Sequence, residues 1–380
     1  MFSFNQAEFG SLDQGIYAIG EYVDSYASRI FFIHDNKVQQ DFCVKMWRLR
    51  ADSLYQTMNQ QVRTEYLVEG LYFNRQCAPE VYLGIAPIQV ILKDEADENS
   101  AIEIQLGKLL AEPHLSDLEE GKEYALVMVR LDNKCQLSNM LQDTFATKES
   151  MEFLAYEIYR MHQQPMDVQE LEKSCKIGSV TTLAWKLALN KNLFLEAVAS
   201  LSLPDEEVER CNNITGIMDD AYMKLSSDFV ERVEQKQIRR CHGDLKATNL
   251  WVYTANESTI DAQKNKRQLL ALDCIDFKPE FCHIDTLSDI AMLAIDIELF
   301  VTGVMDKESG KALAKHFLAT YLEYAHEQQN KVWPLLDYYM VEKAMVGTYG
   351  NILFDRQLEQ GKCYILLALD HAQNLRASGT

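Results

Sequence analysis

The spacing of the apolar residues changes about a third of the way along this chain, and that change limits its fold more than any other feature. Up to residue 130, short apolar runs with strand character are separated by turn residues, at 29–34, 42–47, 81–92 and 124–131. A helical pattern at 51–76 lies between the second and third runs. The first part of the chain is therefore predicted to be β-rich, with one helix.

Beyond residue 141 the pattern is mainly that of amphipathic helices, predicted at 147–164, 181–200 and 215–236. Short strand-like segments at 250–253 and 268–273 interrupt it, and helices resume from about 286 to the end with breaks near Pro334 and Gly347. A β-rich part followed by an α-rich part predicts an α+β fold. We expect an N-terminal lobe at 1–130 and a C-terminal lobe at 131–380.

The composition restricts the partners and the location. Hydrophobic residues form 47% of the 380 residues, enough for a full core. The formal net charge of −20 opposes binding to nucleic-acid phosphates, so no nucleic-acid partner is expected. Nine cysteines without a C-x-x-C pair predict reduced thiols in the cytoplasm, and no apolar segment is long enough to span a membrane. No signal peptide is indicated, which leaves open secretion by a route that needs none.

The segment CHGDLKATNLWV at 241–252 carries the clearest functional pattern. It places Asp244 and Asn249 five positions apart, and Asp273 ends the next apolar strand. Phosphoryl transfer needs a carboxylate that accepts or orients the attacking hydroxyl, together with oxygen ligands for Mg²⁺. These three side chains can supply both, with Asp244 at the phosphate acceptor and the other two at the metal.

The pattern H-G-D-x-x-x-x-N, followed by an apolar strand pair that ends in Asp, resembles the catalytic loop and metal site of aminoglycoside phosphotransferases in the protein-kinase-like superfamily. The segments at 78–88, 241–250 and 272–298 are similar in particular to an uncharacterised bacterial phosphotransferase domain that is often fused to a P-loop nucleotide-binding domain. The G-x-x-x-x-G-K-[ST] loop of that fused domain does not occur here. The resemblance implies a bilobal protein-kinase-like fold, the cofactors ATP and Mg²⁺, and a hydroxyl-bearing acceptor.

Residue by residue, the resemblance assigns Asp244 as the catalytic base and His242 as a brace of the catalytic loop at 241–250. It assigns Asn249 and Asp273 as Mg²⁺ ligands, the second within a metal-binding segment at 271–285. Asp276, which begins a D-F sequence, is an alternative or an additional ligand.

Other polar residues near these motifs have two interpretations. Lys246 matches a lysine that serine/threonine protein kinases carry near the γ-phosphate, but it equally fits an exposed surface lysine. Asp285 and Asp289 are expected to be structural, because a buried Asp at a helix start commonly holds a loop through backbone N–H groups. His162 lies at a predicted helix end and is also expected to be structural.

The nucleotide side is predicted from the first part of the chain. Lys45 lies on an apolar strand and matches the strand lysine that holds the α- and β-phosphates in this superfamily, although an edge-strand lysine is the alternative. Its acidic partner is expected on the next helix, where Glu65 and Glu69 share a face. The adenine is expected near Met128 to Arg130.

The loop expected to cover the phosphates differs from the pattern of the related family. Gly10, Gly15 and Gly20 are too widely spaced for a G-x-G-x-x-G loop, so we place the phosphate loop at 24–28.

Three functions remain open at this point. The first is a kinase acting on a small, cationic hydroxyl compound, and the second is a protein kinase, favoured by Lys246. The third is a nucleotide-binding module with little turnover. An acidic helical insert either lines a cationic pocket or forms a solvated helix face; its residues are Asp205, Glu206, Glu207, Glu209, Asp219 and Asp220.

Overall fold

The computed structural model describes residues 15–52, 54–92, 102–254 and 267–377. The chain forms two compact units. The N-terminal unit is built from residues up to Asp132 together with the later segment Leu270–Lys278. The C-terminal unit contains Asn133–Thr254, Arg267–Leu269 and the chain from Pro279 onward.

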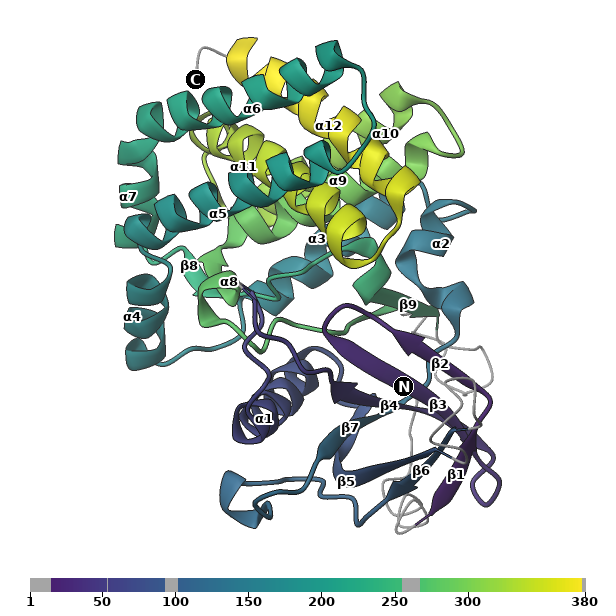
Figure 1. Ribbon diagram of the computed structural model, residues 1–380. Helices are drawn as coiled ribbons and strands as arrows, with labels where there is room; N and C mark the ends of the chain where they lie inside the picture. Colours follow the sequence, from purple (N-terminus) through teal and green to yellow (C-terminus); the bar gives the residue numbers. More distant parts are fainter. Residues whose placement is uncertain (1–14, 53, 93–101, 255–266, 378–380) are drawn as a thin grey trace. The chain divides into compact units, whose positions relative to one another are not determined.

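The N-terminal unit holds a seven-stranded antiparallel sheet with the strand order β1-β6-β5-β7-β4-β3-β2 (Figure 1). All four predicted strands are present. Three short strands were missed, because β1 and β2 have four residues each and β6 five, too few for an alternating pattern to stand out. The strands are β1 Ile16–Ile19, β2 Glu21–Asp24, β3 Ser28–Asp35, β4 Gln40–Trp47, β5 Tyr82–Leu92, β6 Ile102–Leu106 and β7 Tyr124–Val129.

The predicted helix of this unit is confirmed, but it begins later than expected. Helix α1 covers Gln60–Cys77, and the side chain of Asn59 caps it by accepting a hydrogen bond from the Gln61 N–H. Ahead of it, the Asp52 carboxylate accepts the backbone N–H groups of two following residues, which stabilises a turn in place of a helical start.

The sheet packs its apolar side chains into one buried cluster. Alternate residues along β3 and β4 face this cluster, as expected for a strand with one covered face. Fully buried members are Phe31, Phe42, Val44, Ile104 and Ala125.

The C-terminal unit is mainly helical (Figure 1). Beyond residue 133 the chain also forms two two-stranded sheets, β8 with β11 and β9 with β10. The boundary between the units falls within β10, whose residues from Leu270 onward belong to the N-terminal unit. The strands are β8 Ile238–Arg240, β9 Leu250–Thr254, β10 Arg267–Ala271 and β11 His283–Asp285. The helices are α2 Leu137–Leu141, α3 Lys148–His162, α4 Val168–Ile177, α5 Val180–Ala199, α6 Asp205–Lys224, α7 Ser226–Glu234, α8 Pro279–Cys282, α9 Thr286–Thr302, α10 Lys307–Tyr324, α11 Gln329–Tyr349 and α12 Leu358–Ala377.

Two boundaries in this unit differ from the prediction. The single helix expected at 215–236 is two helices, α6 and α7, which meet at Leu225. The break expected at Pro334 does not occur: this proline lies inside α11, and the helix continues through it. Among the described residues, no helix combines the length and the apolar character needed to cross a membrane.

Helix α9 is the centre of the C-terminal unit and positions the candidate site. Nearly all its residues are buried, including the acids Asp289, Asp296 and Glu298. The Asp285 carboxylate caps its first turn by accepting the Leu287 N–H, and it also pairs with the buried Arg232. Buried acids need such partners, so each of them indicates a specific contact.

Candidate functional site

The predicted catalytic loop begins directly after β8 and ends in β9. Strand β8 pairs with β11, which leads straight into α9. Gly243 has a φ of +85°, a backbone conformation that favours glycine over any residue with a side chain. A short 3₁₀ turn at Ala247–Asn249 then returns the chain to β9.

The Asp289 carboxylate holds the first half of this loop. One oxygen accepts the Gly243 N–H at 2.9 Å, and the other accepts the His242 N–H at 3.0 Å and bonds to the His162 ring at 3.1 Å. Burial alone would raise the pKa of Asp289, but the His162 hydrogen bond and the other partners outweigh it and lower that pKa. Asp289 therefore braces the loop as an ionised carboxylate, which confirms its predicted structural role.

The Asp296 carboxylate holds the second half of the loop. It accepts the Ala247 N–H at 2.6 Å and the Tyr364 hydroxyl at 2.5 Å. Burial raises the pKa of Asp296 to about 6, although both hydrogen bonds act in the opposite direction. Two acids of one helix thus fix the loop that carries Asp244.

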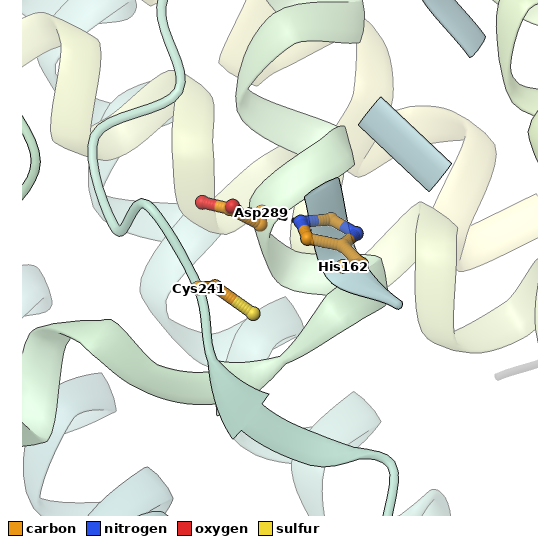
Figure 2. Close-up of side chains that lie close together, drawn as sticks. All are labelled: His162, Cys241 and Asp289. Atoms are coloured by element: carbon orange, nitrogen blue, oxygen red, sulfur yellow. Dashed lines mark hydrogen bonds and ion pairs between the residues drawn. The ribbon is translucent and has the colours of Figure 1, made fainter. Parts of the chain in front are cut away.

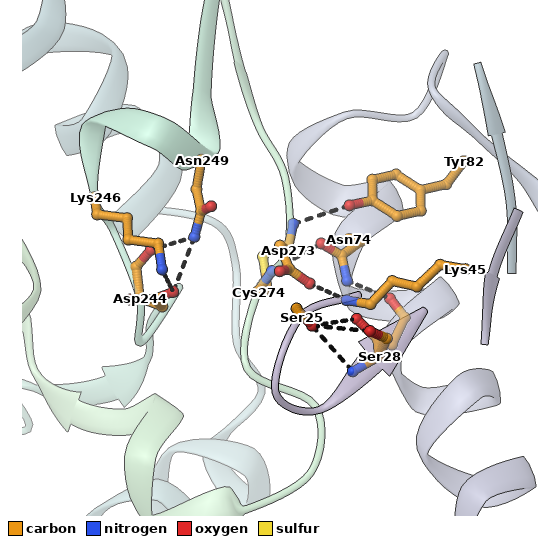
Figure 3. A network of polar contacts seen from close by, with 11 residues as sticks. Ser25, Ser28, Lys45, Asn74, Tyr82, Asp244, Lys246, Asn249, Asp273 and Cys274 are labelled. Atoms are coloured by element: carbon orange, nitrogen blue, oxygen red, sulfur yellow. Dashed lines mark hydrogen bonds and ion pairs between the residues drawn. The ribbon is translucent and has the colours of Figure 1, made fainter. Parts of the chain in front are cut away.

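The functional side chains of this loop lie close together, as Figure 3 shows for Asp244, Lys246 and Asn249. The Asn249 amide nitrogen donates to the Asp244 carboxylate at 3.0 Å and to its backbone oxygen at 3.0 Å. Because both bonds use the nitrogen, the amide oxygen points to the other side of the side chain. The Lys246 ammonium lies 3.0 Å from the same Asp244 carboxylate, whose side chain is 30% exposed. The loop therefore presents one accessible carboxylate with an amide and a cation beside it.

His242 is almost fully buried beneath this group. Its Nδ1 atom accepts the Asp244 N–H at 3.3 Å. The ring thus contacts the backbone of the candidate base, the kind of bracing contact that the resemblance assigned to it.

One group of three buried potential metal ligands occurs among the described residues: His162, Cys241 and Asp289 (Figure 2). The second ring nitrogen of His162 already bonds to the Tyr321 hydroxyl at 2.7 Å. Burial and nearby carboxylates raise the pKa of the Cys241 thiol well above its ordinary value. Hydrogen bonds within the protein therefore occupy both ring nitrogens of His162 and both oxygens of Asp289.

In the N-terminal unit, Lys45 of β4 forms an ion pair with Asp273 (Figure 3). The lysine side chain is mostly buried and lies 5.8 Å from the Trp47 ring centre, whereas the Asp273 side chain is 57% exposed. The structure therefore brings together two residues of the predicted site: Lys45, predicted to hold phosphates, and Asp273, predicted to bind a metal.

The backbone around Asp273 is held by neutral side chains. Asp273 has a φ of +64°, and its N–H donates to the Tyr82 hydroxyl at 2.9 Å. The Cys274 N–H donates to the Asn74 amide oxygen at 2.9 Å, and the Asn74 nitrogen donates to the Gly70 carbonyl at 2.8 Å. Burial, and then the Asp273 charge, raise the pKa of Tyr82 well above its ordinary value, so the phenol stays protonated.

Asp276 and Phe277 continue this segment against helix α1. A β-carbon added to Gly70 would lie 2.2 Å from an Asp276 carboxylate oxygen, so α1 approaches this acid at its glycine. The Phe277 ring packs on Tyr55 at 4.4 Å and on Trp47 at 6.0 Å between ring centres. Asp276 therefore lies on the same segment as Asp273, close to the helix surface.

The two glutamates expected to pair with Lys45 lie on α1. Glu69 is exposed, and Glu65 is half-buried and accepts a hydrogen bond from Gln61 at 2.9 Å. The partner of Lys45 that the structure identifies is Asp273.

The predicted phosphate loop is a tight turn between β2 and β3. The Ser25 hydroxyl accepts the Ser28 N–H at 3.0 Å, and Arg48 and Arg50 donate to the backbone oxygens of Ser25 and Tyr26. Two arginines thus hold the turn. Gly10, one of the three glycines compared with a glycine-rich loop, lies outside the described residues.

The predicted adenine-binding residues form the end of β7 and the chain just after it. Met128 pairs with Cys43 and Tyr82 in the sheet. The Arg130 N–H donates to the Asp41 backbone oxygen at 3.0 Å, and its side chain pairs with Glu21.

The acidic insert is a solvated helix face. Its six acids are exposed on α6, three of them in the first turn, where they interact favourably with the helix dipole. Asp219 pairs with Lys191 on the neighbouring helix. Of the two interpretations of the insert, the structure supports this one.

The sequence reasoning missed several residues that build the site, above all Asp296, Tyr364 and Asn74. The sequence did contain a signal for Asp296. Positions 285, 289 and 296 are separated by four and seven residues, which places these three acids on one side of a largely apolar helix.

No protein-family model matches the chain. A search of curated proteins found uncharacterized proteins of Mycobacterium tuberculosis and Mycobacterium bovis, each 24% identical over 270 residues. The match covers 69% of this chain and 48% of each relative, so the chain spans about half the length of the curated relatives it matches.

A search of solved structures found three similar chains. An ethanolamine kinase of Plasmodium vivax is similar with a TM-score of 0.50 and 12% identity, covering 94% of this chain and 82% of that one. A glucosamine kinase has a TM-score of 0.41, 13% identity and coverages of 95% and 96%. An aminoglycoside phosphotransferase of Alicyclobacillus acidocaldarius has a TM-score of 0.33, 12% identity and coverages of 95% and 91%.

The similarity to the ethanolamine kinase shows that this chain has the same fold, of the protein-kinase-like class. Its antiparallel N-terminal sheet and larger helical C-terminal part confirm the predicted α+β class.

Proposed function

We propose that this chain is an ATP- and Mg²⁺-dependent phosphotransferase that moves the γ-phosphate to a hydroxyl group, most simply one on a small molecule. The supporting observation is the Asp244 carboxylate, accessible on a loop whose backbone N–H groups are held by the buried Asp289 and Asp296. A base that is fixed before the substrate arrives needs little rearrangement during the reaction.

The side chains present fit a magnesium nucleotide. A carboxylate oxygen of Asp273 and the amide oxygen of Asn249 are the hard ligands that Mg²⁺ prefers, and Lys45 is a cation suited to phosphate. When bound, Mg²⁺ would neutralise charge on the β- and γ-phosphates. Asp276 is proposed as an additional oxygen ligand on the same segment.

Each residue of the catalytic loop has a proposed task. Asp244 orients the acceptor hydroxyl and takes its proton, while His242 holds the Asp244 backbone through the contact described above. Lys246, already beside Asp244, offsets negative charge on the transferred group.

A serine/threonine protein kinase is the second candidate function, because Lys246 lies within ion-pair distance of Asp244 at 3.0 Å. That contact supports this candidate, because serine/threonine protein kinases carry a lysine near the γ-phosphate at the position that Lys246 matches.

The test is transfer from γ-labelled ATP with Mg²⁺ to hydroxyl-bearing metabolites and aminoglycosides or to basic proteins. Label on a small molecule supports the first candidate and label on protein the second. ATP binding without transfer would indicate a nucleotide-binding module with little turnover.

Two variants test the residue assignments. Asp244→Asn should abolish transfer and leave nucleotide binding nearly intact, while Asp273→Ala should weaken Mg²⁺–ATP binding itself. Asp220→Asn, at an exposed acid of α6, is the matched control and should change neither. Full activity of Asp244→Asn would remove the assignment of the base.

A further inference from the structure

Two cysteine thiols face each other next to the proposed metal-binding segment. The sulfur atoms of Cys77 and Cys274 lie 3.9 Å apart, and both residues belong to the N-terminal unit. Cys274 follows Asp273 directly and is 6% exposed, and Cys77 is the last residue of α1 and is half-buried. A solute can therefore reach one member of the pair.

A hydrogen bond from the same helix sets this arrangement. The Asn74 side chain accepts the Cys274 N–H at 2.9 Å and so holds its backbone against α1. Cys77 lies three residues after Asn74, on the same face of the helix. The two sulfur atoms are thus brought together by the fold itself.

We propose that Cys77 and Cys274 form a reversible disulfide under oxidising conditions, and that this bond weakens Mg²⁺–ATP binding. The sulfur atoms must approach by about 1.9 Å to reach the length of a disulfide. Cys77 occupies the final turn of α1, where few hydrogen bonds follow, so this end of the helix can adjust. Cytosolic disulfides of this kind are transient and act as redox sensors.

Hydrogen peroxide is a sufficient oxidant. It first converts the more accessible Cys77 thiolate to a sulfenic acid and releases hydroxide. The Cys274 sulfur then attacks the Cys77 sulfur, the S–O bond breaks and water leaves with the thiol proton. In total two thiols and one peroxide give one disulfide and two waters, and dithiothreitol reverses the change.

The effect on binding rests on the proposed function. Asp273 is paired with Lys45 in this structure and must leave that lysine to bind a metal. A disulfide at the next residue ties this backbone covalently to α1 and restricts the rearrangement. We expect Mg²⁺–ATP affinity to fall by about tenfold, at the lower end of what disturbed outer-shell contacts cost a metal site.

Peptide mapping by mass spectrometry after peroxide treatment, without reductant, tests the bond. The expected product is a linked pair of peptides containing Cys77 and Cys274, absent from Cys77→Ser. Titration with Mg²⁺ and a fluorescent ATP analogue, before and after oxidation and again after dithiothreitol, tests the effect. Cys363→Ser is the matched control, because Cys363 is exposed on α12 and should not alter the response.

The outcomes separate this inference from the proposed function. If no linked peptide forms, or if oxidation weakens binding equally in Cys77→Ser, the inference is wrong while the proposed function stands. A linked peptide in a protein that binds no nucleotide when reduced would confirm the disulfide and refute both the proposed function and the regulatory effect.

Discussion

The two units hold their candidate functional residues by different chemistry. In the C-terminal unit, the buried carboxylates of Asp289 and Asp296 accept the backbone N–H groups of the catalytic loop. In the N-terminal unit, the neutral side chains of Tyr82 and Asn74 hold the backbone beside Asp273. Hydrogen bonds to charged groups are about twice as strong as neutral ones. The loop with the candidate base is therefore held by strong, charge-assisted hydrogen bonds. The segment with Asp273, the proposed metal ligand, is held by neutral hydrogen bonds that cost less to break.

The largest expected effect is that of removing the charged anchor. Asp289→Ala leaves two backbone N–H groups and the His162 ring without their buried acceptor. We expect the free energy of unfolding to fall by about 3–5 kcal/mol, as for other broken buried ionic contacts. Urea unfolding followed by circular dichroism measures this, with Asp220→Ala as the exposed control. A loss of unfolding free energy below about 1 kcal/mol would equal that of one ordinary hydrogen bond. It would contradict the proposed difference in strength between the charged and the neutral contacts.

A second prediction concerns the stability of the protein at acidic pH. His283 of β11 is buried, bonds to Ser174 at 2.8 Å, and has its pKa lowered to about 4 by burial and then by nearby positive charges. The unfolded chain binds a proton at this residue between about pH 6.5 and pH 4 that the folded chain does not. Stability is thus expected to fall as pH falls through this window, by about 2 kcal/mol between pH 7 and pH 5.

The variant His283→Gln checks this assignment. It should lack that part of the pH dependence while keeping a polar group toward Ser174. Urea midpoints of both proteins at pH 7 and pH 5 provide the comparison. Parallel losses in the two proteins would show that another group titrates.

The smallest effect is expected at the neutral anchor. Tyr82→Phe removes the hydroxyl that accepts the Asp273 N–H, and the exposed surroundings of Asp273 let water replace it. The expected loss is about 1 kcal/mol, measured under the same urea conditions as Asp289→Ala. A loss equal to that of Asp289→Ala would mean that the two anchors are equally strong.

Features that depend on residues close together in the sequence could be predicted, whereas contacts between distant residues could not. The strands around Lys45 and the loop around Asp244 carry dense patterns within about ten residues, and the structure has a strand and a loop at these positions. Asp289 was expected to be structural because a buried Asp at a helix start commonly holds a loop through backbone N–H groups.

The missed contacts join residues far apart in the chain. Tyr364 reaches Asp296 across 68 positions and Asn74 reaches Cys274 across 200, and no local pattern encodes either pair. The start of α1 was misplaced for a different reason. The Asp52 side chain competes for backbone N–H groups there, and the spacing of apolar residues does not reveal such competition.

Gly70 limits which residue types positions 70 and 276 can accept. A glycine in mid-helix costs about 1 kcal/mol in helix propensity relative to alanine, yet here it makes room for the Asp276 carboxylate. The two positions share one volume, so a larger residue at either one requires a smaller residue or a displaced backbone at the other. In related chains, the size of the residue at position 70 should therefore vary inversely with that at position 276.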